Sequence, residues 1–69
     1  MRPEQEIFRL SVRTSLNLIY TLSRSIVTVM PMDSEAAADV LRTSSALILR
    51  EAVELHDRIS EAYAVKENI

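Results

Sequence analysis

One proline divides this chain into two long stretches that contain no other strong helix breaker. The sequence has no glycine, and its only other proline is Pro3. Proline is well tolerated at the first position of a helix, whereas Pro31 removes a backbone donor and restricts the residue before it. The sequence therefore predicts a single domain over residues 1–69, with a helix over about 3–30, a turn at 31–33 and a helix over about 34–66.

Apolar residues recur at alternating spacings of four and three in both halves, which is the period of one face of an α-helix. The predicted core positions are Phe8, Val12, Ser15, Ile19, Leu22, Ile26 and Val29 in the first helix, and Ala38, Leu41, Ser45, Ile48, Ala52, Leu55, Ile59 and Ala62 in the second. A turn this short makes the helices antiparallel, so that facing residues have numbers summing to about 64. Asp33, or failing that Ser34, is predicted to cap the second helix. The predicted fold class is all-α, an antiparallel two-helix hairpin.

The apolar arc of each helix is wider than one neighbouring helix can cover. Leu16, Tyr20, Val27 and Met30 widen the arc of the first helix to about 160°. A chain of 69 residues also has difficulty burying enough surface alone. A second copy covers the remainder most simply, which predicts a homodimeric four-helix bundle; a different protein is the alternative. The predicted dimer and core seam is Phe8, Val12, Ile19, Leu22, Ile26, Leu41, Ile48, Leu55 and Ile59.

Charge is divided unequally between the two halves. No acidic residue lies between Ile7 and Met32, whereas the segment after Asp33 is rich in acidic residues. The antiparallel alignment predicts cross-helix pairs in which Arg24 meets Asp39, Arg13 meets Glu51, and Arg9 meets Glu54 or Leu55. Each exposed pair contributes only a few tenths of a kcal/mol, so these charges are expected to select the helix register more than to stabilise it.

No residue pattern in the chain indicates catalysis, a metal site or a cofactor. His56 is the only histidine, and Val53 stands where a Glu-x-x-His metal pair requires a glutamate. A nucleophilic serine needs a positioned base and an oxyanion hole, for which the sequence offers no candidate. The prediction is therefore a non-enzymatic protein, with His56 at the edge of the dimer seam.

The best membrane candidate, Leu16 to Met32, is interrupted by Asn17 and Arg24. A membrane-spanning helix needs about 20 mostly apolar residues, and an arginine at mid-depth costs roughly 2.5 kcal/mol or more. The sequence predicts no membrane association and a location in the cytoplasm.

Acidic residues on the outer side of the second helix, next to apolar residues outside its core arc, form a candidate protein-binding surface. Its predicted residues are Val40, Leu47, Glu51, Glu54 and Glu61. Such a surface suits a basic partner, for example a DNA-binding domain; the simpler interpretation is an ordinary solvated face.

Two other interpretations stay open. Arg9, Arg13 and Arg24 form a basic face like the one with which plasmid Rop-type hairpin dimers bind RNA, an analogy that rests on architecture alone. Three arginines without a lysine or an aromatic stack make a thin nucleic-acid footprint, so nucleic acid is the less favoured partner. The third interpretation is an assembly or chaperone-like subunit that completes its bundle with another chain.

The length, the absence of glycine and the turn Met30-Pro31-Met32-Asp33-Ser34-Glu35 together resemble a family of small anti-quorum-sensing proteins encoded by transposable phages of Pseudomonas. The resemblance covers the whole chain but carries no signature motif. It implies a homodimer that binds the DNA-binding domain of a LuxR-type activator in the host cytoplasm and blocks its contact with DNA. It also implies a second target, the ATPase that drives type IV pilus assembly.

Overall fold

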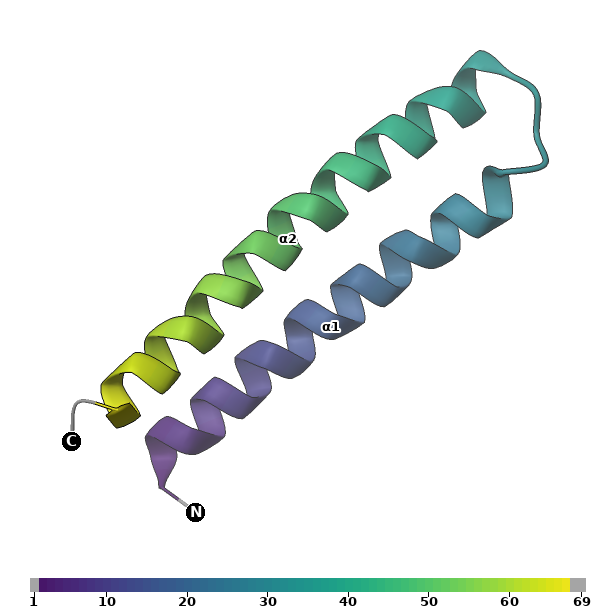
Figure 1. Cartoon of the computed structure of the whole chain (residues 1–69). Coiled ribbons are helices and arrows are strands. Elements are labelled where there is room, and N and C mark those ends of the chain that lie inside the picture. Colours follow the sequence, from purple (N-terminus) through teal and green to yellow (C-terminus); the bar gives the residue numbers. More distant parts are fainter. Residues whose placement is uncertain (1, 68–69) are drawn as a thin grey trace.

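The computed structural model describes residues 2–67, which form two helices joined by a short turn (Figure 1). Helix α1 spans Pro3–Val29 and helix α2 spans Glu35–Glu67. The helices lie side by side and run in opposite directions, so the start of α1 and the end of α2 share one end of the molecule, called the open end below (Figure 1). The predicted all-helical hairpin is confirmed. Residues 1, 68 and 69 of the predicted domain lie outside the described residues.

The two prolines and the nearby acidic residues account for the bounds of α1. The helix begins at Pro3, and Glu4 and Glu6 lie in its first turn, where carboxylates favour the positive end of the helix dipole. It ends at Val29, two residues before Pro31. The carbonyl of Val29 accepts a backbone hydrogen bond from the N–H of Met32 at 2.9 Å, which closes the turn.

Helix α2 is capped by Ser34. The backbone N–H of Ala37 donates a hydrogen bond to the hydroxyl of Ser34 at 3.1 Å. Asp33 was the first choice from the sequence, and that choice is wrong. Because the helix begins at Glu35, the residue directly before it occupies the cap position, and its side chain reaches the N–H of the third helical residue.

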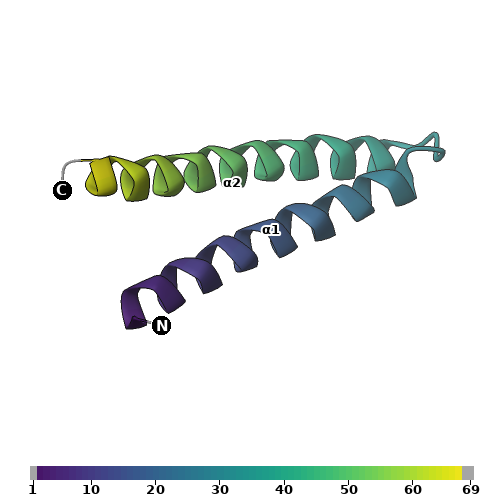
Figure 2. The same ribbon diagram turned by 60° about the horizontal axis from the view of Figure 1, so that its bottom comes forward.

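The hairpin is a single layer with a small interior. Its dimensions are 53 × 21 × 12 Å, and the helices diverge from the turn toward the open end (Figure 2). Among the described apolar side chains only Ala37 and Leu55 are buried, together with the two serines Ser15 and Ser44. Most of the apolar surface that a helical domain normally buries is therefore left open.

The inner face of α2 agrees with the predicted one at six of its eight positions and differs at Ser45 and Ala52. Ser44 is buried and Ser45 is exposed; Glu51 lies between the helices and Ala52 is exposed. The assignment of Ser45 and Ala52 to the hairpin interior is therefore wrong. The sequence pattern gives the centre of a broad apolar arc, whereas α1 covers only one flank of that arc.

Neither helix, over the residues that are described, offers a stretch long and apolar enough to cross a membrane.

Candidate interaction surfaces

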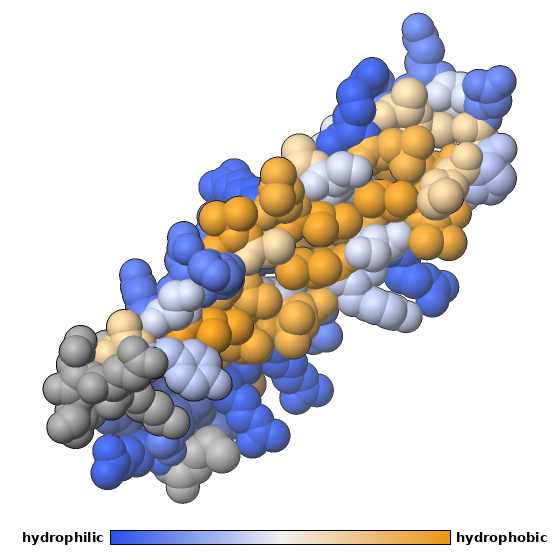
Figure 3. Space-filling view, in the orientation of Figure 1, coloured by the Kyte–Doolittle hydropathy of each residue, from blue (hydrophilic) through white to orange (hydrophobic). Residues whose placement is uncertain are grey.

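One broad face of the hairpin is largely hydrophobic. The space-filling view shows a hydrophobic band over both helices that extends from the turn end past the middle of the hairpin and is interrupted by a few polar residues (Figure 3). At 3.6 residues per turn, one flank of α1 and the matching flank of α2 turn toward this side. This apolar face consists of Phe8, Val12, Leu16, Ile19, Ile26, Val27 and Met30 on α1, with Leu41, Ile48, Leu49, Ile59 and Tyr63 on α2.

The predicted seam residues lie within the hairpin interior or along this face. Leu55 is buried and Phe8 is exposed, and the remaining seven are half-buried: Val12, Ile19, Leu22, Ile26, Leu41, Ile48 and Ile59. Half-burial is the expected state of a side chain that contacts one helix of its own hairpin and points partly outward. Their role in a dimer stays a prediction.

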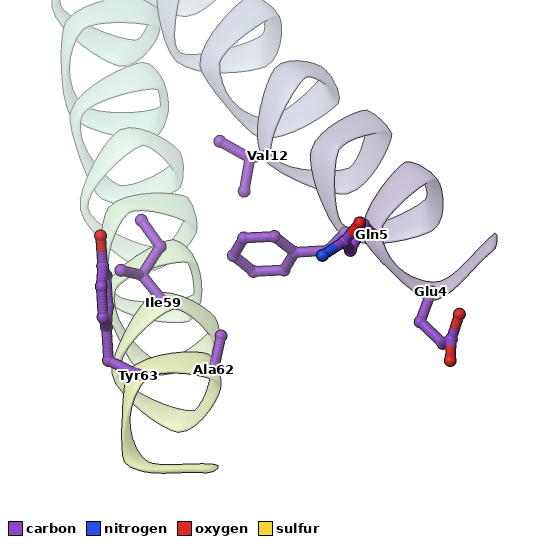
Figure 4. Close-up of a pocket in the computed structure, with 7 residues that line it drawn as sticks. Glu4, Gln5, Val12, Ile59, Ala62 and Tyr63 are labelled. Atoms are coloured by element: carbon purple, nitrogen blue, oxygen red, sulfur yellow. The ribbon is translucent and has the colours of Figure 1, made fainter. Parts of the chain in front are cut away.

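The divergence of the helices opens a groove in the apolar face at the open end. The groove has a volume of about 580 Å³ and is lined by Glu4, Gln5, Phe8, Val12, Ile59, Ala62 and Tyr63. Val12 projects from α1 and Ile59 and Ala62 from α2 toward the same space, whereas Glu4 turns away from it (Figure 4). Its lining is therefore largely apolar, with polar groups at the rim.

The opposite broad face combines apolar and acidic side chains. Val40, Leu47, Glu54 and Glu61 follow one another at seven-residue spacing, so they form one stripe along α2. All four are exposed. Ile7 of α1 lies near the acidic end of this stripe, because it lines a second, shallower groove together with Glu61. These five residues form the back face, which contains four of the five residues predicted to bind a partner.

Glu51, the fifth predicted partner residue, lies between the helices. The hydroxyl of Ser15 donates a hydrogen bond to Glu51 Oε1 at 2.6 Å and accepts one from Arg58 Nη2. Arg58 Nη2 also lies 3.6 Å from Glu51 Oε1. Ser15 is 3% exposed, and the Glu51 side chain is 18% exposed. Glu51 is therefore unsuited to direct partner contact.

This Ser15–Glu51–Arg58 cluster is the main polar feature of the hairpin interior. Among the ion pairs in the described residues, the pair of Glu51 and Arg58 is the only one whose acidic side chain is mostly shielded from solvent. One donor, Arg58 Nε, is buried without a partner in the described structure. Removing one member of such a cluster is costly, because the remaining charges and donors lose their partners while still shielded.

The predicted cross-helix ion pairs are wrong. Asp39 pairs with Arg42 and Glu54 with Arg50, both within α2, the second at 3.4 Å. A partner three or four residues away on the same helix lies within easy reach of a carboxylate. The third predicted acid, Glu51, is engaged by Arg58 from a later turn of α2.

Arg9, Arg13 and Arg24 share the outer edge of α1, on the side away from α2. Arg13 follows Arg9 by one turn, and Arg24 lies roughly 22 Å from Arg9 along the helix axis. All three are exposed. The guanidinium of Arg24 lies 6.0 Å from the ring centroid of Tyr20 and donates a hydrogen bond to its hydroxyl at 3.2 Å. These three residues form the arginine edge.

His56 is exposed, and its Nδ1 lies 3.3 Å from Asp57 Oδ1. Over the described residues, no group of three or more histidine, aspartate or glutamate side chains is arranged to hold a metal ion.

Comparison with protein-family models, with curated proteins and with solved structures found no match for this chain.

Proposed function

We propose that the protein is a homodimeric, non-enzymatic inhibitor that acts by binding a regulatory protein. The observation that carries this proposal is the shape of the hairpin, a layer 12 Å thick with large hydrophobic side chains exposed on both broad faces. A single helical layer cannot bury two apolar faces by itself, and exposed apolar patches of this extent mark contact sites for other chains.

The apolar face is assigned to a second copy. The hairpin measures 53 by 21 Å, which gives a broad face of about 1,100 Å². Stable protein interfaces typically bury about 800 Å² on each partner, so this face is large enough for one. Two hairpins joined in this way form a four-helix bundle, with the two back faces on its outside.

The back face is assigned to the target. Val40 and Leu47 supply apolar anchors, and Glu54 and Glu61 supply negative charge toward the open end. Negative charge accelerates encounter with a basic surface, whereas buried apolar contacts set the lifetime of the complex. The DNA-binding domain of a LuxR-type activator has the required basic surface, and the resemblance to phage anti-activators favours it. The pilus assembly ATPase is the second target that this resemblance suggests.

The test compares two double charge reversals with the same change in net charge. Glu54→Lys with Glu61→Lys alters the back face, and Asp39→Lys with Asp57→Lys alters exposed acids on the outer edge of α2. Inhibition is measured as the loss of promoter DNA binding by a LuxR-type DNA-binding domain in a mobility-shift titration. The back-face variant is expected to require at least about tenfold more protein, because two lost charge contacts amount to roughly 1.4 kcal/mol. The control is expected to match the parent.

Full inhibition by the back-face variant would overturn the assignment of this face. Absence of inhibition by the parent protein would overturn the choice of target. Glu51 is excluded from the design, because its substitution would disturb the cluster between the helices as well as any surface.

The RNA-binding alternative is favoured only by the arginine edge. It predicts retention of RNA with an affinity that falls steeply as salt rises, since neutralising phosphates releases counterions. Substitution of Arg9 and Arg13 by alanine would then abolish retention, whereas the anti-activator proposal expects this variant to inhibit as well as the parent. An assembly subunit would instead be a monomer that melts weakly without its partner.

A further inference from the structure

The two ends of the apolar face have opposite shapes. At the open end the diverging helices leave the groove of about 580 Å³ between Phe8 and Val12 on one side and Ile59 on the other. At the turn end the helices are close together (Figure 2), and the side chain of Met30 is exposed. Met30 follows Val12 by eighteen residues, or five full helical turns, so it lies on the same side of α1 as the groove.

A two-fold dimer built on the apolar face has two possible arrangements. If the axis runs parallel to the helices, both turns lie at the same end, and each groove faces the partner's groove. If the axis runs across the helices, the turn of each copy lies over the groove of the other. Protein interfaces are packed as closely as interiors, so two facing hollows are disfavoured relative to a hollow filled by a protruding end.

From this complementarity we infer that the occupant of the open-end groove is the turn end of a second copy, with Met30 of the partner inserted between Phe8 and Ile59. The two hairpins then lie antiparallel, with their turns at opposite ends of the bundle. This inference rests on the proposed homodimer and specifies its geometry. Methionine suits the role, because its flexible thioether side chain fills irregular apolar gaps and makes favourable contacts with aromatic rings.

The antiparallel arrangement has an electrostatic consequence. It places α1 against α1 of the partner, so that the two arginine edges, six arginines in all, lie on one side of the bundle. Repulsion between exposed like charges is weak and screened by salt, with a Debye length of about 8 Å at physiological ionic strength. Burial of an apolar side chain outweighs it.

Spin-label distances test the arrangement directly, because the chain has no cysteine of its own. A nitroxide is attached at Asp33→Cys in the exposed turn of the full-length protein, and the distance between the two labels of a dimer is measured by pulsed electron resonance. The antiparallel arrangement predicts about 40 Å, because Phe8 and Met30 are about 33 Å apart along α1 and Asp33 lies a few residues beyond Met30 in each copy. The parallel-axis arrangement predicts about 20 Å or less, the width of the bundle.

A label at Ala46→Cys, on the outer edge of α2 near its middle, is the control. Both arrangements give a short distance there, so this label reports whether a dimer exists. A long distance at Asp33 with a short one at Ala46 supports the inference. Short distances at both positions overturn it and leave the proposed homodimer intact, whereas no intermolecular distance at either position overturns the homodimer as well.

A pair of substitutions tests the inserted side chain. Met30→Ala is expected to raise the Kd of the dimer at least about tenfold, because each dimer loses two buried methionine side chains. Thr28→Ala, on the outer side of the same helix turn, is expected to leave the Kd within about twofold. Equal effects of the two substitutions would contradict the insertion of Met30.

Discussion

The cluster of Ser15, Glu51 and Arg58 makes a quantitative prediction about the hairpin interior. In the variant Glu51→Leu, the hydroxyl of Ser15 loses a carboxylate acceptor, and a hydrogen bond to a charged group is worth about 1.5–3 kcal/mol. The ion pair adds less than about 1 kcal/mol, since the Arg58 side chain is 36% exposed and can be hydrated. The free energy of unfolding is therefore expected to fall by about 2–3 kcal/mol.

Replacement of the whole cluster is expected to behave differently. The triple variant Ser15→Ala, Glu51→Leu, Arg58→Leu leaves no shielded donor or charge without a partner. Exchanges of buried ion pairs for well-packed apolar residues are often neutral or stabilising by about 1–4 kcal/mol. The triple variant should thus unfold with a free energy within about 1 kcal/mol of the parent, or above it.

Urea unfolding followed by helical circular dichroism measures these values. The protomer concentration is held fixed, because the stability of a dimer depends on it. Glu54→Leu is the matched control, since Glu54 is an exposed carboxylate that pairs with Arg50 at 3.4 Å within one turn. Its effect should stay below about 0.5 kcal/mol. Equal losses in Glu51→Leu and the control, or a triple variant as unstable as Glu51→Leu, would refute the reasoning.

Three further predictions concern other parts of the molecule. Ser34→Ala should lower the free energy of unfolding by about 1 kcal/mol in the same urea assay, because the cap of α2 is lost, whereas Asp33→Ala should change it by only a few tenths; equal effects would contradict the assigned cap. Leu55→Ala should lower it by about 2–5 kcal/mol as a buried large-to-small change, against less than about 1 kcal/mol for the exposed control Leu10→Ala. The Kd of the dimer, measured by sedimentation equilibrium between about 0.05 and 0.5 M salt, should fall as salt screens the adjoining arginine edges, and a rising Kd would contradict their proximity.

The sequence was sufficient to predict the architecture because local signals agree with one another. Pro31 and the absence of glycine determine where helices can run, and the spacing of apolar residues fixes their type. The two helices and their antiparallel arrangement follow from these features alone. Tertiary contacts were not needed to infer them.

The details of the interior could not be predicted in the same way. Apolar periodicity identifies a broad arc, but it does not tell which flank of that arc meets the other helix. Ser44 and Ser45 are equally small and polar, and only the position of α1 distinguishes the buried residue from the exposed one. Glu51 was assigned to the surface because glutamate is rarely shielded without a partner. Its partners, Ser15 and Arg58, are 36 and 7 residues away in the sequence, so no local pattern reveals them.

The polar cluster gives the hairpin a contact with one defined geometry, which its apolar face does not provide. Apolar side chains on two helices can pack in several registers with similar energies, because hydrophobic contact has no direction. The hydrogen bond between Ser15 and Glu51 has one geometry, and a slip of either helix by one residue would break it. The cluster therefore selects the register of α1 against α2 and, with it, the flank of each helix that is left open. In this way one shielded polar contact determines which hydrophobic residues form the face proposed to bind the second copy.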